Sequence, residues 1–415
     1  MLERFTSAFG ALVMLGLAFA LCPADRRRSV NLRSVGGGVL LLLGLGLLVL
    51  KTPLTRLFSW ANTAVELLLG FTRDGARFVF GNLVTDPKTF GFIFAFQVLP
   101  TILFFSALMS LLYHLRVMPW IIERGGRLLS RSLGVSGAES FSTVADVFVG
   151  QTEAPLVIRP YLARMTASEI NACMVAGYAT TAGGVLAAYV AMLGPSVPGI
   201  AGHLIASSVM SAPASLVIAK LMLPEIENPE TSNDVRIALP ESNSNALEAI
   251  ASGAIDGLKL AANVAAMLIV FLAFTALADA LLAGAGRIIG VELGLQRVLG
   301  FVFSPLAWLL GVPSGDVSKI AGLLGQKTLF NEFIAYSRMA EMLHQDPAWL
   351  SERGRLVTSY ALCGFANFGS IGIQIGGYSA LAPERRGDIS RLALRAMFGG
   401  LLTTCLVACV AGIFL

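Results

Sequence analysis

The motif GQTEAPL, at residues 150–156, is the most informative feature of the sequence for the fold. It lies within a mainly apolar segment, Leu133–Leu162, that has basic residues at both ends. Because basic residues gather on the cytoplasmic side of a membrane, both ends are expected on one side, and the chain must enter and turn back. Gly150 and Pro155 would interrupt a helix at the turn. Irregular backbone is tolerated at membrane depth where protein or water covers it, so the stretch predicts the polar tip of a re-entrant hairpin.

The composition as a whole is typical of a membrane protein. Of the 415 residues, 55% are hydrophobic and 13% are charged, and that charged fraction is about half the average of soluble domains. Uncharged runs such as Phe92–Leu112, Leu260–Ala278 and Ala396–Leu415 approach the roughly 20 residues that a helix needs to cross the hydrocarbon core. The net charge of +4 is small and does not indicate binding to nucleic acid.

Arginine clusters predict the orientation of the chain. Basic residues gather at 26–33, 116–131, 159–164 and 385–395, and all of them are assigned to the cytoplasmic side. With the N-terminus outside, eight transmembrane helices satisfy this assignment, at about 7–22, 36–50, 92–115, 172–193, 200–223, 260–282, 357–381 and 396–415. Leu54–Phe80 is interrupted by charges and is expected to lie at the interface as an amphipathic helix.

The second half of the chain is predicted to repeat the order of the first, inverted. A segment with Pro305 and Pro313 leads to Asn331 and Glu332, and a span with a glycine-rich centre follows. Paired interruptions of this kind are typical of secondary transporters, whose substrate sites lie at mid-membrane between the repeats. The predicted fold class is an all-α polytopic membrane protein with eight transmembrane helices, two re-entrant helical hairpins in an inverted repeat, and interfacial amphipathic helices.

Three carboxylates fall within the predicted membrane segments: Asp146, Glu153 and Glu332. An ionisable residue at this depth is costly unless it is paired, protonated or facing water, so each is a candidate functional residue. Glu153 stands beside Gln151 and Thr152, and these three groups can hydrogen-bond the edge of a heterocyclic base. The alternative is that they only cap the backbone of the hairpin itself.

Glu332 is the counterpart in the second half. Its carboxylate can accept from two neighbouring hydroxyls, as a ribose diol presents, whereas a salt bridge to Lys327 is the structural alternative. Asn367 and Ser370 in the following broken span would share one face if that segment is locally helical. Phe365 beside them could stack on a ring or serve in packing.

Asp146 lies four residues before the glycine of the hairpin tip and is expected to face the interrupted centre of a span, residues 180–185. Transporters coordinate sodium with unwound backbone carbonyls and one or two oxygen side chains, and Asp146 and Thr180 fit that description. The alternative is that Asp146 caps the end of a hairpin helix.

Four motifs resemble those of the concentrative nucleoside transporter family in order and spacing. They are GAES at 137–140, GQTEAPL at 150–156, NEF at 331–333 and CGFANF at 363–368, and the resemblance runs from about Leu54 to the end of the chain. It implies a bacterial inner-membrane protein that imports nucleosides such as uridine or adenosine, coupled to a cation gradient. It also implies a homotrimer in the lipid bilayer, in which a transport domain moves like an elevator against a trimeric scaffold.

The resemblance and the pattern together divide the chain into six parts. They are two N-terminal transmembrane helices (1–53), an interfacial helix with a scaffold helix (54–132), a first repeat of the transport domain with its hairpin and two spans (133–223), a polar loop with an interfacial helix (224–259), a scaffold transmembrane helix (260–294) and a second repeat (295–415).

The same resemblance implies the binding residues. Contacts with the base are expected from Gln151, Thr152, Glu153 and Val185; contacts with the ribose are expected from Glu332, Asn367 and Ser370, with Phe365 lining the pocket. The cation site is expected at Asp146, Val149, Thr180 and Thr181.

Two positions depart from the family pattern, and the departure at Asp146 matters because it adds a charge. Sodium-coupled members usually have Asn where this chain has Asp146, and often Ser in place of Thr180. Sodium could neutralise the carboxylate of Asp146, and so could a proton, because burial favours the uncharged acid. Sodium is favoured as the coupling ion, a proton stays open, and no organic cofactor is expected.

Two other classes of protein also place carboxylates in the membrane. An intramembrane enzyme would use Asp146, Glu153 and Glu332 as acid and base groups, and a channel would use them as pore groups. Their distribution over two hairpins, without a clustered nucleophile or metal-ligand motif, speaks against an enzyme. A channel needs no tightly defined ligand site and cannot accumulate a solute.

Overall fold

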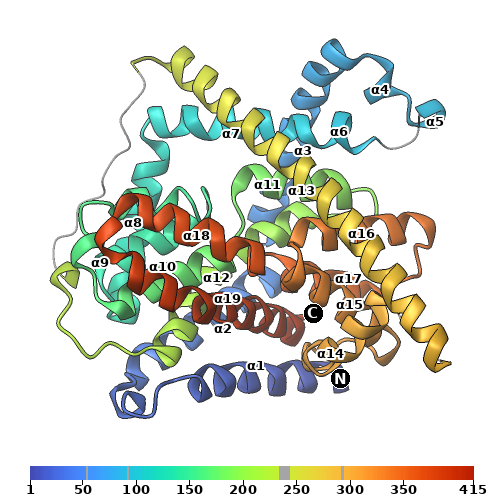
Figure 1. Cartoon of the computed structure of the whole chain (residues 1–415). Helices are drawn as coiled ribbons and strands as arrows, with labels where there is room; N and C mark the ends of the chain where they lie inside the picture. The colour runs from blue at the N-terminus through green and yellow to red at the C-terminus, as the bar shows by residue number, and fades with distance from the viewer. Residues whose placement is uncertain (53–54, 91–92, 233–243, 291–293) are drawn as a thin grey trace.

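The structure, a computed structural model, describes residues 1–52, 55–90, 93–232, 244–290 and 294–415 (Figure 1). In these ranges every regular element is a helix and none is a β-strand. The predicted all-α class is confirmed. Small and aliphatic residues from most of these helices share one continuous buried core.

Seven helical stretches of the described ranges are long and apolar enough to cross a membrane. They are Leu2–Ala20, Leu32–Lys51, Phe94–His114, Ala167–Leu193, Ile200–Met222, Ala246–Ala285 and Pro383–Phe414. Each overlaps one of the eight predicted spans, and the remaining predicted span, 357–381, consists of two shorter helices separated by a break. Eight as the total number of crossings therefore stays a prediction.

The N-terminal helices lie on the outside of the molecule. α1 (Leu2–Ala20) and α2 (Leu32–Lys51) pack against α12 (Ile200–Met222) and α19 (Arg386–Phe414). The next elements are α3 (Thr55–Phe80), the short helices α4 (Asn82–Thr85), α5 (Pro87–Phe90) and α6 (Phe94–Gln97), and α7 (Leu99–His114). The amphipathic helix expected over 54–80 is thus present as α3, except that residue 54 lies outside the described residues.

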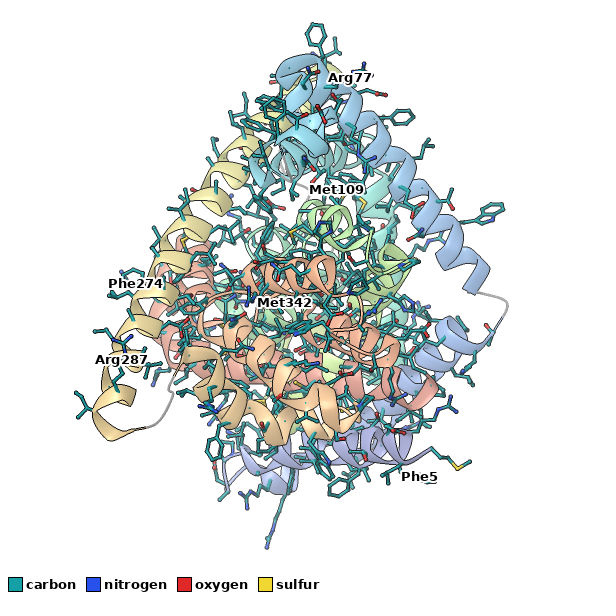
Figure 2. All side chains as sticks on the ribbon, turned by 90° about the vertical axis from the view of Figure 1, so that its right-hand side faces the viewer. Phe5, Arg77, Met109, Phe274, Arg287 and Met342 are labelled. Carbon is teal, nitrogen blue, oxygen red and sulfur yellow. The ribbon has the colours of Figure 1, made fainter. Side chains whose placement is uncertain are left out.

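The longest helix is α13 (Ala246–Ile289), which has 44 residues and crosses the face of the molecule in Figure 1. Figure 2 shows α13, marked by Phe274 and Arg287, and α3 along opposite edges of the molecule. α13 runs without a break through 259/260, so the predicted division into an interfacial helix and a scaffold span falls within one helix and stays a prediction. The charges of Asp256 and Lys259 pair with each other at 3.1 Å on the exposed side and leave the helix uninterrupted.

α8 (Val117–Leu133) leads into the first repeat, whose first helix is α9 (Gly137–Asp146). The chain turns after α9 and continues through two 3-10 turns, η2 (Ala154–Ile158) and η3 (Leu162–Arg164). The turn lies where the hairpin tip was predicted, but the second limb is not α-helical, because Pro155 and Pro160 lack the N–H groups that a regular helix needs. A broken span follows, α10 (Ala167–Ala179) and α11 (Gly183–Leu193), and then α12.

The second repeat has the same order of elements. α14 (Leu295–Leu309) and α15 (Ser314–Leu329) are bent by 118° at their junction, and α16 (Glu332–Gln345) follows a polar turn. A second broken span, α17 (Glu352–Leu362) and α18 (Phe368–Leu381), leads through η5 (Pro383–Arg385) into α19. The predicted polar tip at Asn331 and Glu332 therefore lies between two helices, as the hairpin pattern requires.

The two broken spans touch at their breaks. Gly364 has φ +149°, and a Cβ added there would lie 2.9 Å from the carbonyl oxygens of Tyr178 and Ala179. Only glycine tolerates both this conformation and this approach. Beside it, the Thr181 hydroxyl and the Cys363 thiol are 3.5 Å apart. Unwound backbone from both repeats thus meets in the buried centre of the molecule.

A buried ion pair holds the first hairpin to α12. Glu139, in the capping box of α9, lies 2.7 Å from Lys220 Nζ, and the two side chains are 1% and 11% exposed. Removing one partner of such a pair leaves an uncompensated buried charge, at a cost of about 3–5 kcal/mol. We expect Lys220→Met to lower the apparent Tm of the purified protein by about 5 °C or more in a thermal melt.

The control for this experiment is Arg338→Met, which removes an exposed ion pair with Glu341. Exposed pairs contribute about 0–1 kcal/mol, so the control is expected to melt close to the wild type. The double variant Glu139→Gln/Lys220→Met should recover part of the lost Tm. Equal melting of Lys220→Met and the wild type would contradict a stabilising role for this pair.

Candidate substrate and cation site

A cavity of about 1020 Å³ lies between the two repeats and the outer helices α7 and α13. One side is formed by the first hairpin tip, α11, the junction of α15 and α16, and the second break. The other side includes Met109 of α7, labelled in Figure 2, and Asn263 of α13. This volume is at the upper end of the roughly 300–1,000 Å³ of small-molecule pockets.

All eight residues predicted to bind a nucleoside line this cavity. Gln151, Thr152 and Glu153 come from the first hairpin tip, Val185 from α11, Glu332 from the start of α16, and Phe365, Asn367 and Ser370 from the second break and the start of α18. The fold thus brings both repeats to one wall. Their role in binding stays a prediction.

Glu332 is the most completely positioned of these residues. Its side chain is buried, Oε1 accepts from the Tyr189 hydroxyl at 2.8 Å, and Oε2 accepts from Asn367 Nδ2 at 3.2 Å. A carboxylate oxygen can accept two hydrogen bonds, so each oxygen keeps one free acceptor position. The carboxylate is therefore oriented by the protein and still able to receive two hydroxyl protons from a ligand.

The alternative of a salt bridge between Glu332 and Lys327 does not hold. Lys327 is fully buried, and its Nζ donates instead to the carbonyl oxygen of Ala361 at 2.7 Å and to Thr404 Oγ1 at 2.9 Å. The lysine joins α15 to the end of α17 and to α19, and among the described residues it forms no ion pair with Glu332.

Asparagine caps shape both helix starts that face the cavity. Asn331 Oδ1 accepts from the backbone N–H of Ile334 at 2.9 Å and begins α16. Asn367 Oδ1 accepts from the backbone N–H of Ser370 at 2.8 Å and begins α18. Because the oxygen of Asn367 is used for the cap, its Nδ2 is directed towards Glu332. The predicted shared face of Asn367 and Ser370 is thus the first turn of α18.

Gln151 reaches across to the second repeat. Its Nε2 donates to Ser370 Oγ at 3.2 Å, and its Oε1 accepts from Gln374 Nε2 at 3.1 Å. These bonds contradict the alternative that Gln151 only caps its own hairpin. Thr152 and Glu153, in contrast, are exposed towards the cavity.

Asp146 and its surroundings lie behind the hairpin tip. The tip contacts the first break directly, because the backbone N–H of Gly183 donates to the carbonyl oxygen of Phe148 at 2.8 Å. Val149 lines the cavity, whereas Asp146, Thr180 and Thr181 are fully buried and are not among its lining residues. Three of the four residues of the predicted cation site therefore lie behind the polar wall of the cavity, and Val149 lies at that wall.

The residues at this place fit a cation. Both carboxylate oxygens of Asp146 are buried and have no hydrogen-bond partner among the described residues, so the alternative of a helix cap does not hold. An unpaired buried carboxylate is costly, and a cation or a proton would remove that cost. Thr180 donates its hydroxyl proton to the carbonyl oxygen of Ala176 at 2.9 Å, which leaves the hydroxyl oxygen free to act as a ligand.

Two residues of the site were missed in the sequence. Tyr189 donates to Glu332, and Gln374 donates to Gln151. Tyr189 follows Val185 by four residues, and Gln374 follows Ser370 by four residues. Extending each predicted contact by one helical turn places both residues on the face of the site, but it does not identify their hydrogen-bond partners.

Family profiles match most of the chain. Profiles described as "Na+ dependent nucleoside transporter N-terminus", "Nucleoside recognition" and "Na+ dependent nucleoside transporter C-terminus" match residues 9–83, 95–196 and 203–412. The chain is 42% identical to an "Uncharacterized transporter" of Haemophilus influenzae, over 99% of this chain and 97% of that protein. It is also 42% identical to Sodium/nucleoside cotransporter 1 of Rattus norvegicus, over 99% of this chain but 64% of that longer protein.

Solved structures agree with these matches. The structure of CNTnw in an inward-facing substrate-bound state is 42% identical and superimposes with a TM-score of 0.93 over 100% of both chains. A CNTnw variant in an outward-facing state is 41% identical and superimposes with a TM-score of 0.92, over 100% of this chain and 98% of that one. The chain is therefore not an enzyme, and it belongs to the concentrative nucleoside transporter family of sodium-dependent nucleoside transporters.

Proposed function

We propose that this protein imports nucleosides such as uridine or adenosine across the inner membrane by secondary active transport. The observation that carries this proposal is the carboxylate of Glu332 in the cavity, oriented by Tyr189 and Asn367 with one free acceptor position on each oxygen. A vicinal diol offers two hydroxyl protons at a matching separation, so this group suits the ribose 2′- and 3′-hydroxyls.

The base is expected at the first hairpin tip. Gln151, Thr152 and Glu153 offer an amide, a hydroxyl and a carboxylate there, and Val185 offers an apolar contact. Phe365 lies beside them and can pack against a ring. The polar groups with exposed ends suit contacts with a base either directly or through water.

The coupling ion is expected at Asp146, Val149, Thr180 and Thr181. A bound sodium ion would supply the positive charge that the buried carboxylate of Asp146 lacks, and a proton would do the same. Sodium is favoured, because the family is described as sodium-dependent. The hairpin tip carries Asp146 of the cation site near one end and Gln151 of the nucleoside site near the other. An arrangement of the tip that stabilises cation binding therefore also favours nucleoside binding, and linkage makes this effect reciprocal.

Transport is expected to follow an elevator motion. The repeats 133–223 and 295–415 would form the moving domain, and α7 and α13 would belong to the static scaffold. The position of the cavity between the repeats and these two helices supports this division. α13 is largely exposed along its length, with Ile269, Phe274 and Leu281 more than half exposed. Such apolar surfaces suit the lipid bilayer and the contacts of a homotrimer.

The test is uptake of radiolabelled uridine and adenosine into proteoliposomes with an imposed sodium or proton gradient. We expect accumulation above the outside concentration with an inward sodium gradient, and loss of the accumulated label when the gradient is collapsed. A channel would only equilibrate the label. No uptake of either nucleoside under either gradient would refute the proposed substrate class.

A further inference from the structure

Gln374 is a fully buried amide behind the wall of the cavity. It lies on α18 one turn after Ser370 and is not among the residues that line the cavity. Its Nε2 donates to Gln151 Oε1 and to the backbone carbonyl oxygen of Met174 on α10, both at 3.1 Å. Gln374 therefore joins the first hairpin tip, the first broken span and α18.

The close approach of these elements depends on Gly177. A Cβ at this position would lie 2.8 Å from Gln374 Nε2 and 3.0 Å from Gln151 Cβ. The absence of a side chain on this turn of α10 lets both amides pack against the helix. Their mutual position is thus set by packing as well as by hydrogen bonding.

The orientation of the Gln374 amide is fixed by the main chain. The carbonyl oxygen of Met174 can only accept a hydrogen bond, so the NH₂ end of Gln374 must face it. The reversed amide would place two oxygens against each other in a buried position. The NH₂ end is then also the end that faces Gln151, which must present its oxygen.

The orientation of the Gln374 amide also determines the orientation of the Gln151 amide at the cavity. With its oxygen facing Gln374, Gln151 must direct its NH₂ end towards Ser370 Oγ, where it donates at 3.2 Å. A serine hydroxyl can donate or accept and cannot by itself orient Gln151. Once Ser370 accepts from Gln151, its own proton is free for a ligand.

We propose that Gln374 is a positioning residue that sets the hydrogen-bond polarity of the nucleoside site. The chain of bonds runs from the Met174 carbonyl through Gln374 and Gln151 to Ser370. It makes Ser370 a donor towards the ligand, and it leaves Gln151 one proton and one acceptor position for the base. The ligand can therefore present an acceptor to the proton of Ser370, such as a ribose oxygen, while Glu332 accepts from ribose hydroxyls. This inference rests on the proposed function.

The test is isothermal titration calorimetry of purified protein with uridine and adenosine at saturating sodium. Gln374→Leu keeps a similar volume but removes the donor, so Gln151 can adopt both amide orientations. We expect affinity to fall about tenfold, the effect of losing one orienting hydrogen bond. Gln374→Glu is expected to bind at least as weakly, because its carboxylate oxygens would face Gln151 Oε1 and the Met174 carbonyl.

A matched control is available in the same fold. Gln326 of α15 is another buried glutamine that donates to a second glutamine, Gln296, whose Oε1 accepts at 2.9 Å and whose side chain is exposed; Gln326 lies outside the cavity lining. Gln326→Leu is expected to bind both nucleosides as the wild type does. Thermal melts of all variants show whether a loss of affinity comes with a loss of folding.

A double-mutant cycle separates positioning from general damage. If Gln374 acts through Gln151, then Gln151→Leu/Gln374→Leu should bind no more than about twofold more weakly than Gln151→Leu alone. If the losses of affinity of the two single variants multiply in the double variant, to about 100-fold, the inference is overturned. Unchanged affinity in both Gln374 variants would also overturn it. If the wild type itself binds neither nucleoside, the proposed function fails instead.

Discussion

Replacing Glu332 by Gln is expected to weaken nucleoside binding about 100-fold or more. The carboxylate accepts from Tyr189 and Asn367 and, in the proposed complex, from two ribose hydroxyls. The amide of Gln keeps one accepting oxygen, but its NH₂ group replaces the other oxygen and faces a group that itself donates. Losing two hydrogen bonds to a charged group, at about 1.5–3 kcal/mol each, accounts for an effect of this size. Titration calorimetry with uridine measures it.

The control for Glu332→Gln is Glu341→Gln on the same helix. Glu341 is exposed, and it pairs with Arg338 on the surface of α16. The control should bind as the wild type does, and both variants should retain the wild-type elution volume in size-exclusion chromatography. Unchanged affinity in Glu332→Gln would remove Glu332 from the binding site.

Replacing Asp146 by Asn is expected to raise the sodium concentration for half-maximal uptake about tenfold, with sodium still required. The reason is that a buried carboxylate without a hydrogen-bond partner attracts a cation more strongly than a neutral amide does, by about 1.4 kcal/mol or more in a site of low polarity. Uptake of uridine into proteoliposomes, measured over a range of sodium and proton gradients, gives this value for both proteins.

Asp388→Asn is the control for Asp146→Asn. Asp388 is ion-paired with Arg385 and Arg391 at the start of α19, away from the cavity. Its sodium dependence should equal that of the wild type. If protons drive accumulation in the wild type and sodium does so only in Asp146→Asn, then Asp146 is a proton site and sodium is not the native coupling ion.

Much of the fold could be predicted because membrane helices are marked by length and apolarity. Seven of the eight predicted spans coincide with helices that satisfy both criteria. The continuity of α13 through 259/260 was not predicted, because the sequence does not show that Asp256 and Lys259 ion-pair on an exposed helix face, where a charge pair does not end a helix. The 3-10 form of the second hairpin limb also escaped prediction, because its two prolines mark an interruption without specifying the conformation that replaces the α-helix.

The cavity wall could be predicted because its residues sit in short polar motifs at breaks in apolar segments. The supporting groups could not, because their partners are set by packing between distant helices. Nothing local indicates that Tyr189 reaches Glu332, or that Lys327 binds the main chain at Ala361 and not a carboxylate. The same holds for Gln374, whose partners are 223 and 200 residues away in the sequence.

The carbonyl of Met174 has a consequence for how specificity can evolve. Since that acceptor belongs to the backbone, no substitution can turn it into a donor, and the direction of the amide chain through Gln374 and Gln151 is inherited from it. A single replacement that reverses one member of the chain, such as Gln374→Glu, leaves two acceptors facing each other, and an apolar replacement leaves a buried polar group without a partner. A transporter of this kind can therefore change its preference gradually at Thr152 or Val185, but a reversed donor and acceptor pattern at Ser370 requires several residues to change together.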